Sequence, residues 1–427
     1  MKSMEYPRIL VVSNNSFSLS NPNGRTLGNM FIGWPKECLA ELCISTDGAN
    51  FDLCDNYYCI SDKDILTAFM QLRKAKGRKL VQNETGYINI NTGIKGQGKT
   101  ATKAFVRHIL WSCNRWKSKE LVEWIDDFNP DAVLLQNGDS AFMLHMARKI
   151  SCDRKKPLLL FNTEGNCLFE QDWMRRDKLS WLSFPIYKYL LRRETSKLMQ
   201  RTKFIIHGNQ LLKEDYDRAY GVPGEVVYTG SDVNWSEKPF NSSLPQIVYT
   251  GNFGFNRPAS LAIVAKTLLS INSKFTLNVY GRPASKQQEQ VLTHSDGIVF
   301  HGEVPYSKVK EIIAHADVLI HAEGMDEYFQ EALRYGFSTK IADSLSSGRP
   351  FLLFSRPEIA CADYIKTTGA GWFASNENEL KEMFNLLIYN EEDRVSRLLK
   401  AKKIAQQNHN VEACRLKFQQ LILQVIQ

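Results

Sequence analysis

The chain has 427 residues, of which 43% are hydrophobic and 23% are charged, and its formal net charge is +8. This composition is typical of an ordinary folded protein and excludes a disordered or fibrous one. A chain of this length exceeds the size at which a single hydrophobic core stops growing, so at least two domains are expected. The positive charge favours anionic partners: nucleotides, phosphates, acidic lipids or nucleic acid.

The cysteines, histidines and apolar runs indicate a reduced, metal-free protein that does not cross a membrane. The nine cysteines and eight histidines show no zinc-ligand spacing, so no metal site is expected. The apolar run near the N-terminus is too short for a signal peptide, and no stretch approaches the ~18 apolar residues of a membrane-spanning helix. We expect a cytoplasmic location, with the inner face of the membrane as a surface that the protein can contact.

Short apolar runs alternate with longer helical patterns, which is typical of βαβ units and a mostly parallel sheet. In the first half, strands are predicted at residues 8–13, 42–45, 131–136, 157–161, 203–207 and 225–228, and helices at 119–128, 141–150 and 211–220. In the second half, strands are predicted at residues 246–250, 276–280, 297–300, 317–321, 351–354 and 371–373. The pattern therefore occurs twice, as two Rossmann-like domains require.

The boundary between these domains is predicted at a polar segment with two prolines, residues 232–245. We expect an N-terminal domain at residues 1–233, a linker at 234–245, a C-terminal domain at 246–390 and C-terminal helices at 391–427. A polar interruption at 407–410 predicts that the last helix crosses back onto the first domain.

The segment YGFSTKIADSLSSGRP, residues 335–350, carries the strongest sign of a binding site. Ser338 and Thr339 are good N-caps, and Gly348 ends the helix that they begin. A helix N-terminus at the carboxyl edge of a parallel sheet favours an anion, and Lys340 adds a positive charge there. Asp343, on the same helix face, can accept from both ribose hydroxyls. An ordinary capped helix is the alternative reading.

This segment resembles the signature EGFGxxxxEAxxxGxP of family 4 retaining glycosyltransferases. It is closer still to the form xSTKIxDxLxxGRP of the capsular and cell-surface polysaccharide branch, and RILVVSNNSFSLSNPNGRT near the N-terminus resembles that branch too. The resemblance implies the α/β GT-B fold, with two Rossmann-like domains that face each other across a cleft. It also implies a nucleoside-diphosphate sugar donor on the C-terminal domain, the acceptor side on the N-terminal domain, and transfer with retention without metal or other cofactor.

Carried over by position, the resemblance places Asp343 at the donor ribose. Ser338, Thr339 and Lys340, at the start of the same helix, are predicted to bind the donor diphosphate, and Phe337 is a further donor-binding candidate. The first glutamate of the family motif aligns with Tyr335, a departure that leaves one carboxylate role open. Glu323, at the end of a predicted strand, is the better placed of two nearby candidates for that role, and Glu331 is the other.

Two further loops of the C-terminal domain are predicted to touch the donor. Gly251 and Asn252 belong to a glycine-rich turn that lets backbone approach a ligand, and Arg257 stands where the family carries a lysine. Gly302 and Val304 match the segment that lays backbone groups against the nucleotide base. Because such contacts leave little identity in the sequence, uracil, guanine and adenine stay open.

In the N-terminal domain, residues 23–26 resemble the loop that closes over the donor diphosphate. Gly24 belongs to this loop, and Arg25 is a candidate stabiliser of the leaving diphosphate, with an exposed turn as the alternative. Glu164 follows a predicted strand near the place where the family often carries a histidine or an aspartate. It is our candidate for a catalytic residue of this domain.

The expected function is transfer of a hexose-like sugar to a glycan or lipid-linked acceptor in polysaccharide biosynthesis. A catalytically silent sugar-nucleotide binding partner and a sugar-nucleotide 2-epimerase are the alternatives. Residues 173–203 hold nine basic residues against two acidic ones, interleaved with aromatic and aliphatic residues. This segment predicts either a helix that contacts an anionic membrane or a long surface helix. No nucleic-acid motif accompanies it, so no nucleic-acid partner is expected.

Overall fold

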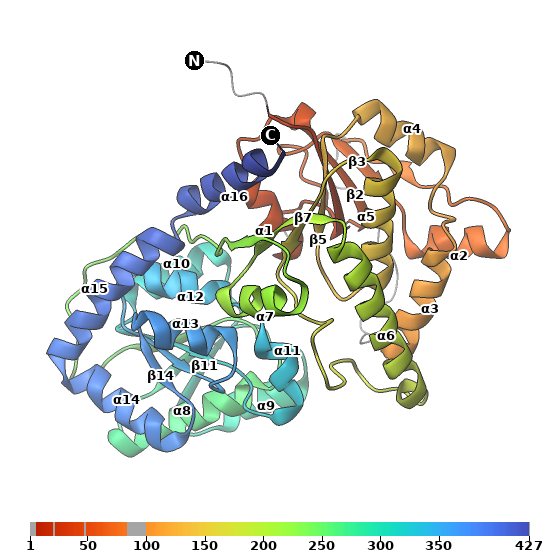
Figure 1. The fold of residues 1–427 in the computed structure, drawn as a ribbon. Coiled ribbons are helices and arrows are strands. Elements are labelled where there is room, and N and C mark those ends of the chain that lie inside the picture. Colours follow the sequence, from red (N-terminus) through yellow and green to blue (C-terminus); the bar gives the residue numbers. More distant parts are fainter. Residues whose placement is uncertain (1–5, 20–21, 47, 83–99, 427) are drawn as a thin grey trace, which may run out of the picture. The chain divides into compact units, whose positions relative to one another are not determined.

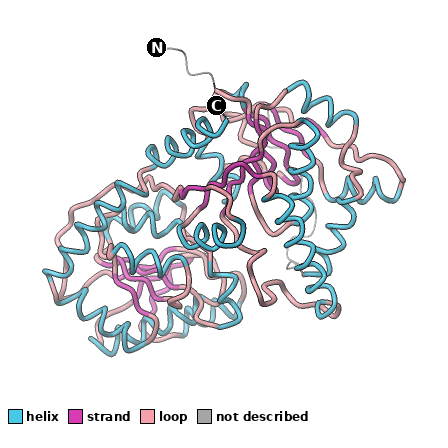
Figure 2. The backbone as a smooth tube through the Cα atoms, viewed as in Figure 1, coloured by secondary structure: helices cyan, strands magenta, loops and turns pink. Residues whose placement is uncertain are grey.

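Two compact units make up the chain in the computed structural model, which describes residues 6–19, 22–46, 48–82 and 100–426. The first unit comprises the described residues up to Gly208, Leu212–Val227 and those from Arg415 onward. The second comprises Asn209–Leu211 and Tyr228–Cys414. Each unit is an α/β domain with its own sheet, and the strands gather in two separate groups (Figure 2). The predicted α/β fold with parallel sheets is confirmed.

The sheet of the first unit has the strand order β4-β3-β2-β1-β5-β6-β7-β8. Its strands are β1 (Ile9–Asn15), β2 (Leu39–Ser45), β3 (Asn56–Cys59), β4 (Arg78–Lys79), β5 (Ala132–Gln136), β6 (Leu158–Asn162), β7 (Thr202–His207) and β8 (Gly224–Val226). All neighbours pair in parallel except β3 and β4. The sequence prediction missed β3 and the two-residue edge strand β4.

Helices connect these strands: α1 (Pro22–Met30), α2 (Asp62–Met70), α3 (Ala101–Ser112), α4 (Lys119–Phe128), α5 (Ala141–Arg154), α6 (Ser180–Met199), α7 (Gln210–Tyr220) and the short 3₁₀ helix η1 (Lys36–Cys38). The three helices predicted in this half are confirmed. The loop expected at residues 23–26 is wrong, because these residues form the first turns of α1. The helical pattern of residues 173–203 begins only at Ser180, and Lys203 already belongs to β7.

The sheet of the second unit has the strand order β11-β10-β9-β12-β13-β14, and all neighbours pair in parallel. Its strands are β9 (Ile247–Thr250), β10 (Leu277–Tyr280), β11 (Ile298–Gly302), β12 (Val318–Ala322), β13 (Phe351–Phe354) and β14 (Trp372–Ala374). The six predicted strands are confirmed. The strand predicted at residues 297–300 ends too early, because β11 extends to Gly302.

The helices of the second unit are α8 (Arg257–Ile271), α9 (Lys286–His294), α10 (Tyr306–His315), α11 (Gln330–Arg334), α12 (Thr339–Ser346), α13 (Ala360–Thr368), α14 (Glu377–Tyr389) and α15 (Glu391–Asn408), with the 3₁₀ helix η2 (Glu327–Phe329). The last helix is α16 (Val411–Ile426). Its residues up to Cys414 belong to the second unit and those from Arg415 onward to the first. The predicted interruption near residues 407–410 is confirmed, since α15 ends at Asn408.

Both faces of the second sheet are buried, which explains the nearly continuous apolar strands. Tyr249 faces one core, to which α8, α9 and α14 contribute, whereas its neighbour Val248 faces the other. Residues of α10, α12, α13 and α15 complete this second core. The sheet is thus held rigidly from both sides, so that its carboxyl edge presents loops in fixed positions.

Candidate functional site

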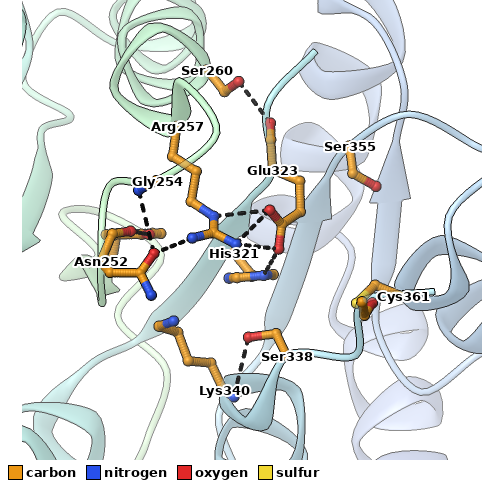
Figure 3. Close-up of polar contacts among 12 residues, drawn as sticks. Asn252, Gly254, Arg257, Ser260, His321, Glu323, Ser338, Lys340, Ser355 and Cys361 are labelled. Atoms are coloured by element: carbon orange, nitrogen blue, oxygen red, sulfur yellow. Dashed lines mark hydrogen bonds and ion pairs between the residues drawn. The ribbon is translucent and has the colours of Figure 1, made fainter. Parts of the chain in front are cut away.

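A buried ion pair lies at the carboxyl edge of the second sheet. Arg257, the first residue of α8, points its guanidinium at Glu323, the residue that follows β12 (Figure 3). Its Nε and Nη2 atoms donate to the two carboxylate oxygens, each over 2.9 Å. Both side chains are almost completely buried. This bidentate geometry fixes the start of α8 against the end of β12.

His321 binds the same carboxylate. Its Nε2 donates to Glu323 Oε1 over 2.8 Å, and Ser260 donates to the Glu323 carbonyl over 2.7 Å. Burial lowers the pKa of His321 despite the nearby carboxylate. Burial of Glu323 raises its pKa, but His321 and Arg257 outweigh that effect and bring it to about 2. Glu323 is therefore an ionised residue with both carboxylate oxygens engaged.

The glycine-rich loop between β9 and α8 lies against Lys340 of α12. Gly251 has φ of +152°, and a Cβ atom there would lie 2.0 Å from Lys340 Cε. Only glycine fits this position. Asn252 accepts from Arg257 Nη1 and, over 3.4 Å, from the Gly254 amide. The loop thereby brings the Lys340 side chain next to the Arg257 guanidinium.

The surroundings of Lys340 destabilise its positive charge. Burial, followed by the positive charge of Arg257, lowers its pKa to about 8, against the raising effects of Glu323 and Asp343. Two cations thus meet at one place, beside the N-terminus of α12. An anion placed there would relieve both the burial and the repulsion.

The N-terminus of α12 has the predicted cap. Ser338 accepts from the Lys340 amide over 3.4 Å, Thr339 begins the helix, and Gly348, with φ of +76°, follows its end. Asp343 lies one turn beyond Lys340 and accepts from Ser231 over 2.7 Å. Burial raises its pKa, against the effect of the Ser231 hydrogen bond. Along α12, the helix N-terminus with Lys340 is therefore followed by the Asp343 carboxylate, as the diphosphate of a nucleotide is followed by its ribose.

Phe337 uses its ring for packing. The ring lies 5.3 Å from that of Tyr228 and 5.1 Å from that of Tyr364, in an aromatic cluster behind the start of α12. Tyr335, in place of the family's first glutamate, is also buried. The two aromatic residues that precede the helix therefore anchor it to the core.

The ends of β9, β10 and β11 complete the edge. The Gly251 amide donates to Tyr280, and the Gly281 amide donates to Gly302 over 2.8 Å. Gly302 has φ of +76°, and Val304 follows in a half-buried loop. Of these residues, Gly251 lies against the Lys340 side chain.

The candidate residues of the first unit lie apart from this cluster in the chain. Gly24 packs closely under the loop after β1, since a Cβ atom there would lie 2.1 Å from the Ser16 carbonyl oxygen. Arg25 is exposed on the first turns of α1, and Glu164 is exposed in the loop after β6. Their catalytic roles stay predictions.

The structure adds residues that sequence reasoning missed. His321 lies inside an apolar strand, and Ser260 and Ser231 are ordinary polar residues of a helix and a loop. Only the alternation of β12, which places His321 and Glu323 on the same side, offered a signal. No cluster of side chains suited to a metal ion occurs among the residues that the structure describes.

Residues 244–390 match the family model described as Glycosyl transferases group 1. No sequence among the curated proteins matches this chain. The match covers the whole candidate site from the glycine-rich loop to the helix α12, and it ends at the C-terminal end of α14.

Solved structures of known proteins share the fold along nearly the whole chain. HepE of Anabaena in complex with UDP has a TM-score of 0.63 at 13% identity, over 97% of this chain and 99% of that one. Sucrose-phosphate synthase from Thermosynechococcus elongatus has a TM-score of 0.63 at 11% identity, over 98% and 99%. WaaG, a glycosyltransferase involved in lipopolysaccharide biosynthesis, has 0.58 at 14% identity, over 97% and 99%.

The chain therefore has the two-domain fold of the GT-B glycosyltransferases. Residues 244–390 of its second unit match the glycosyl transferases group 1 model. The Arg257, Glu323 and Lys340 cluster lies within the matched residues.

Replacing Gly251 by alanine should displace Lys340, because the new Cβ atom would overlap the Lys340 side chain at a φ that alanine avoids. We expect affinity for UDP, measured by calorimetry, to fall about tenfold or more, the loss typical of one charge-assisted contact. Gly254→Ala is the matched control, since its Cβ would meet no atom closer than 3.7 Å. Equal affinities of the two variants would contradict the placement of Lys340.

The lowered pKa of Lys340 predicts pH-dependent binding. Below its pKa of about 8 the free protein holds Lys340 charged, and above it a proton must be taken up before the diphosphate binds. Affinity for UDP should be constant below about pH 8 and fall up to about tenfold per pH unit above it. Calorimetry between about pH 7 and pH 9 measures this. Lys340→Gln should bind weakly at every pH, and a pH slope retained in that variant would assign the titration to another group.

Proposed function

We propose that this protein is a glycosyltransferase that moves a sugar from a nucleoside-diphosphate sugar to a glycan or lipid-linked acceptor in polysaccharide biosynthesis. One observation carries the proposal. Arg257 and Lys340 meet at the capped N-terminus of α12, with Asp343 one turn away, which suits a diphosphate followed by a ribose. The inner face of the membrane, where a lipid-linked acceptor would lie, is the proposed location.

The proposed role of Arg257 and Lys340 is to stabilise negative charge. In the reaction, the bond between the anomeric carbon and the diphosphate oxygen breaks, and both electrons leave with the diphosphate. The acceptor hydroxyl oxygen forms the new bond to the anomeric carbon, on the same face, and its proton passes to an oxygen of the leaving diphosphate. Two fixed cations and a helix N-terminus stabilise the extra negative charge of the leaving diphosphate without requiring a metal ion.

The comparisons support the donor and the acceptor class. HepE is described in complex with UDP and with UDP-glucose, and WaaG as an enzyme of lipopolysaccharide biosynthesis. These statements concern those proteins. They make a UDP-sugar the first donor to test here, while the base and the sugar stay open.

Tyr335 favours a second candidate, a catalytically silent partner that binds a sugar nucleotide. It stands where the family motif has its first glutamate, and its side chain is buried. Glu323 has both carboxylate oxygens engaged by Arg257 and His321, so its geometry suits a positioning role better than contact with the donor sugar. Binding without transfer would follow if no other group replaced the missing carboxylate.

A donor panel separates the two candidates. We expect one UDP- or GDP-sugar to be consumed, with release of the nucleoside diphosphate, in the presence of a lipid-linked or glycan acceptor. An enzyme-coupled assay for UDP or GDP measures the release. If one donor raises the melting temperature but none is consumed with any acceptor, the protein is a silent partner.

Asp343→Ala should weaken binding of UDP by about tenfold or more, because it removes an acceptor for the ribose hydroxyls. The same variant should bind pyrophosphate, which lacks a ribose, as well as the unaltered protein does. Lys340→Gln should weaken both ligands. Calorimetry with the two ligands measures these differences, and an equal loss of both in Asp343→Ala would place this residue at the phosphates instead.

A further inference from the structure

Exposed apolar side chains gather on one layer of helices in the first unit. Of the 22 large hydrophobic residues that are exposed among those described, eleven lie on α2, α3 and α6 or within two residues of them. Single exposed apolar residues are normal on a protein surface, whereas a gathered set marks a contact surface. None of these residues belongs to the donor site.

In its first turns, α6 exposes apolar residues and buries polar ones, which is the reverse of an ordinary surface helix. Such a helix points its apolar residues at the core and its polar residues at solvent. In the first turn of α6 the inward positions hold two buried serines, Ser180 and Ser183, and the fully buried apolar residues of the helix begin only at Tyr187. The outward positions hold Trp181, which is 76% exposed, Ile186 and Tyr189, which is 65% exposed. Packing onto the first unit therefore does not explain why this helix is apolar on its outer side.

The neighbouring helices extend this face. Thr102 of α3 bonds to Asp177 and Ser183, each over 2.8 Å, which fixes the start of α3 beside the start of α6. Arg107 of α3 pairs with Asp62 at the start of α2 over 2.7 Å. Figure 1 shows α3 beside both helices. These two helices also carry exposed apolar residues of their own: Val106 and Ile109 of α3, and Phe69 and Met70 of α2.

Positive charges surround the apolar stripe of α6. Arg175, Arg176 and Lys178 are exposed directly before the helix, and Arg193 is exposed at its far end. An apolar stripe with tryptophan and tyrosine, flanked by cations, matches the chemistry of the bilayer interface. A second copy of the chain fits less well, because a symmetric pairing would bring the same cations together.

We propose that the outward side of α2, α3 and α6 binds the surface of an anionic lipid bilayer. The stripe Trp181, Leu182 and Ile186 enters the interface, and Arg175, Arg176 and Lys178 contact the headgroups. No helix in the described part of the chain is long and apolar enough to cross a membrane, so this contact lies on the bilayer surface. The inference deepens the proposed location at the membrane, and it can be tested apart from the proposed transfer because it requires neither donor nor acceptor.

The test is flotation of the full chain with vesicles of phosphatidylcholine alone or with about one third phosphatidylglycerol. The protein should float with the anionic vesicles and bind them less in about 0.5 M salt, where charges are screened. The triple variant Trp181→Ser, Leu182→Ser and Ile186→Ser should bind at least about tenfold more weakly. The matched control, Tyr389→Ser with Leu399→Ser, removes two residues of the second unit that are 58% and 65% exposed, and should bind as the unaltered protein does.

Three results would overturn the proposal: no binding of the unaltered protein to anionic vesicles, undiminished binding of the triple variant, or a dimer in solution that the triple variant dissociates. The last would assign the face to a second copy. Equal melting temperatures and UDP affinities, measured without vesicles, show that the triple variant is folded. Because UDP binding and vesicle binding are measured separately, failure of one leaves the other proposal intact.

Discussion

The ion pair between Arg257 and Glu323 holds together the segments on which the candidate donor site depends. It joins the start of α8 to the end of β12, and His321 and Ser260 fix the carboxylate in turn. Removing one member of such a pair leaves an uncompensated buried charge, at a cost of about 3–5 kcal/mol. The pair is therefore a constraint on the fold as much as a part of the site.

The same pair determines the state of Lys340. Glu323 balances Arg257, but the guanidinium still lies close enough to lower the pKa of the lysine. The glycine-rich loop leaves room for the Lys340 side chain at this place because Gly251 has no Cβ atom. A bound diphosphate would offset the repulsion between the two cations, so their unfavourable interaction in the free protein favours binding of the ligand. This is electrostatic preorganisation built from backbone geometry.

Local signals in the sequence predicted part of this site. The cap at Ser338, the glycine after α12 and the alternation of strands and helices depend on neighbouring residues, so the pattern alone revealed them. The Arg257 and Glu323 pair joins residues 66 positions apart, and the Ser231 and Asp343 bond spans 112. No spacing rule reaches that far. Short edge strands such as β4 were missed because two residues carry no period.

The helix α6 shows why a charge count was insufficient. The sequence revealed an excess of basic residues over 173–203, which left a membrane helix and an ordinary surface helix as alternative readings, the surface helix slightly favoured. Choosing between these readings requires knowing which side of α6 is buried. Contacts with neighbouring helices determine that side, such as the hydrogen bond between Thr102 and Ser183. The buried side carries Ser180 and Ser183 in the first turn and fully buried apolar residues only from Tyr187 onward, so the exposed apolar residues of these turns, such as Trp181, need another partner. The proposed partner is the surface of the lipid bilayer, in which a lipid-linked acceptor is confined. Binding to the bilayer would raise the effective concentration of the acceptor without any contact to the acceptor itself.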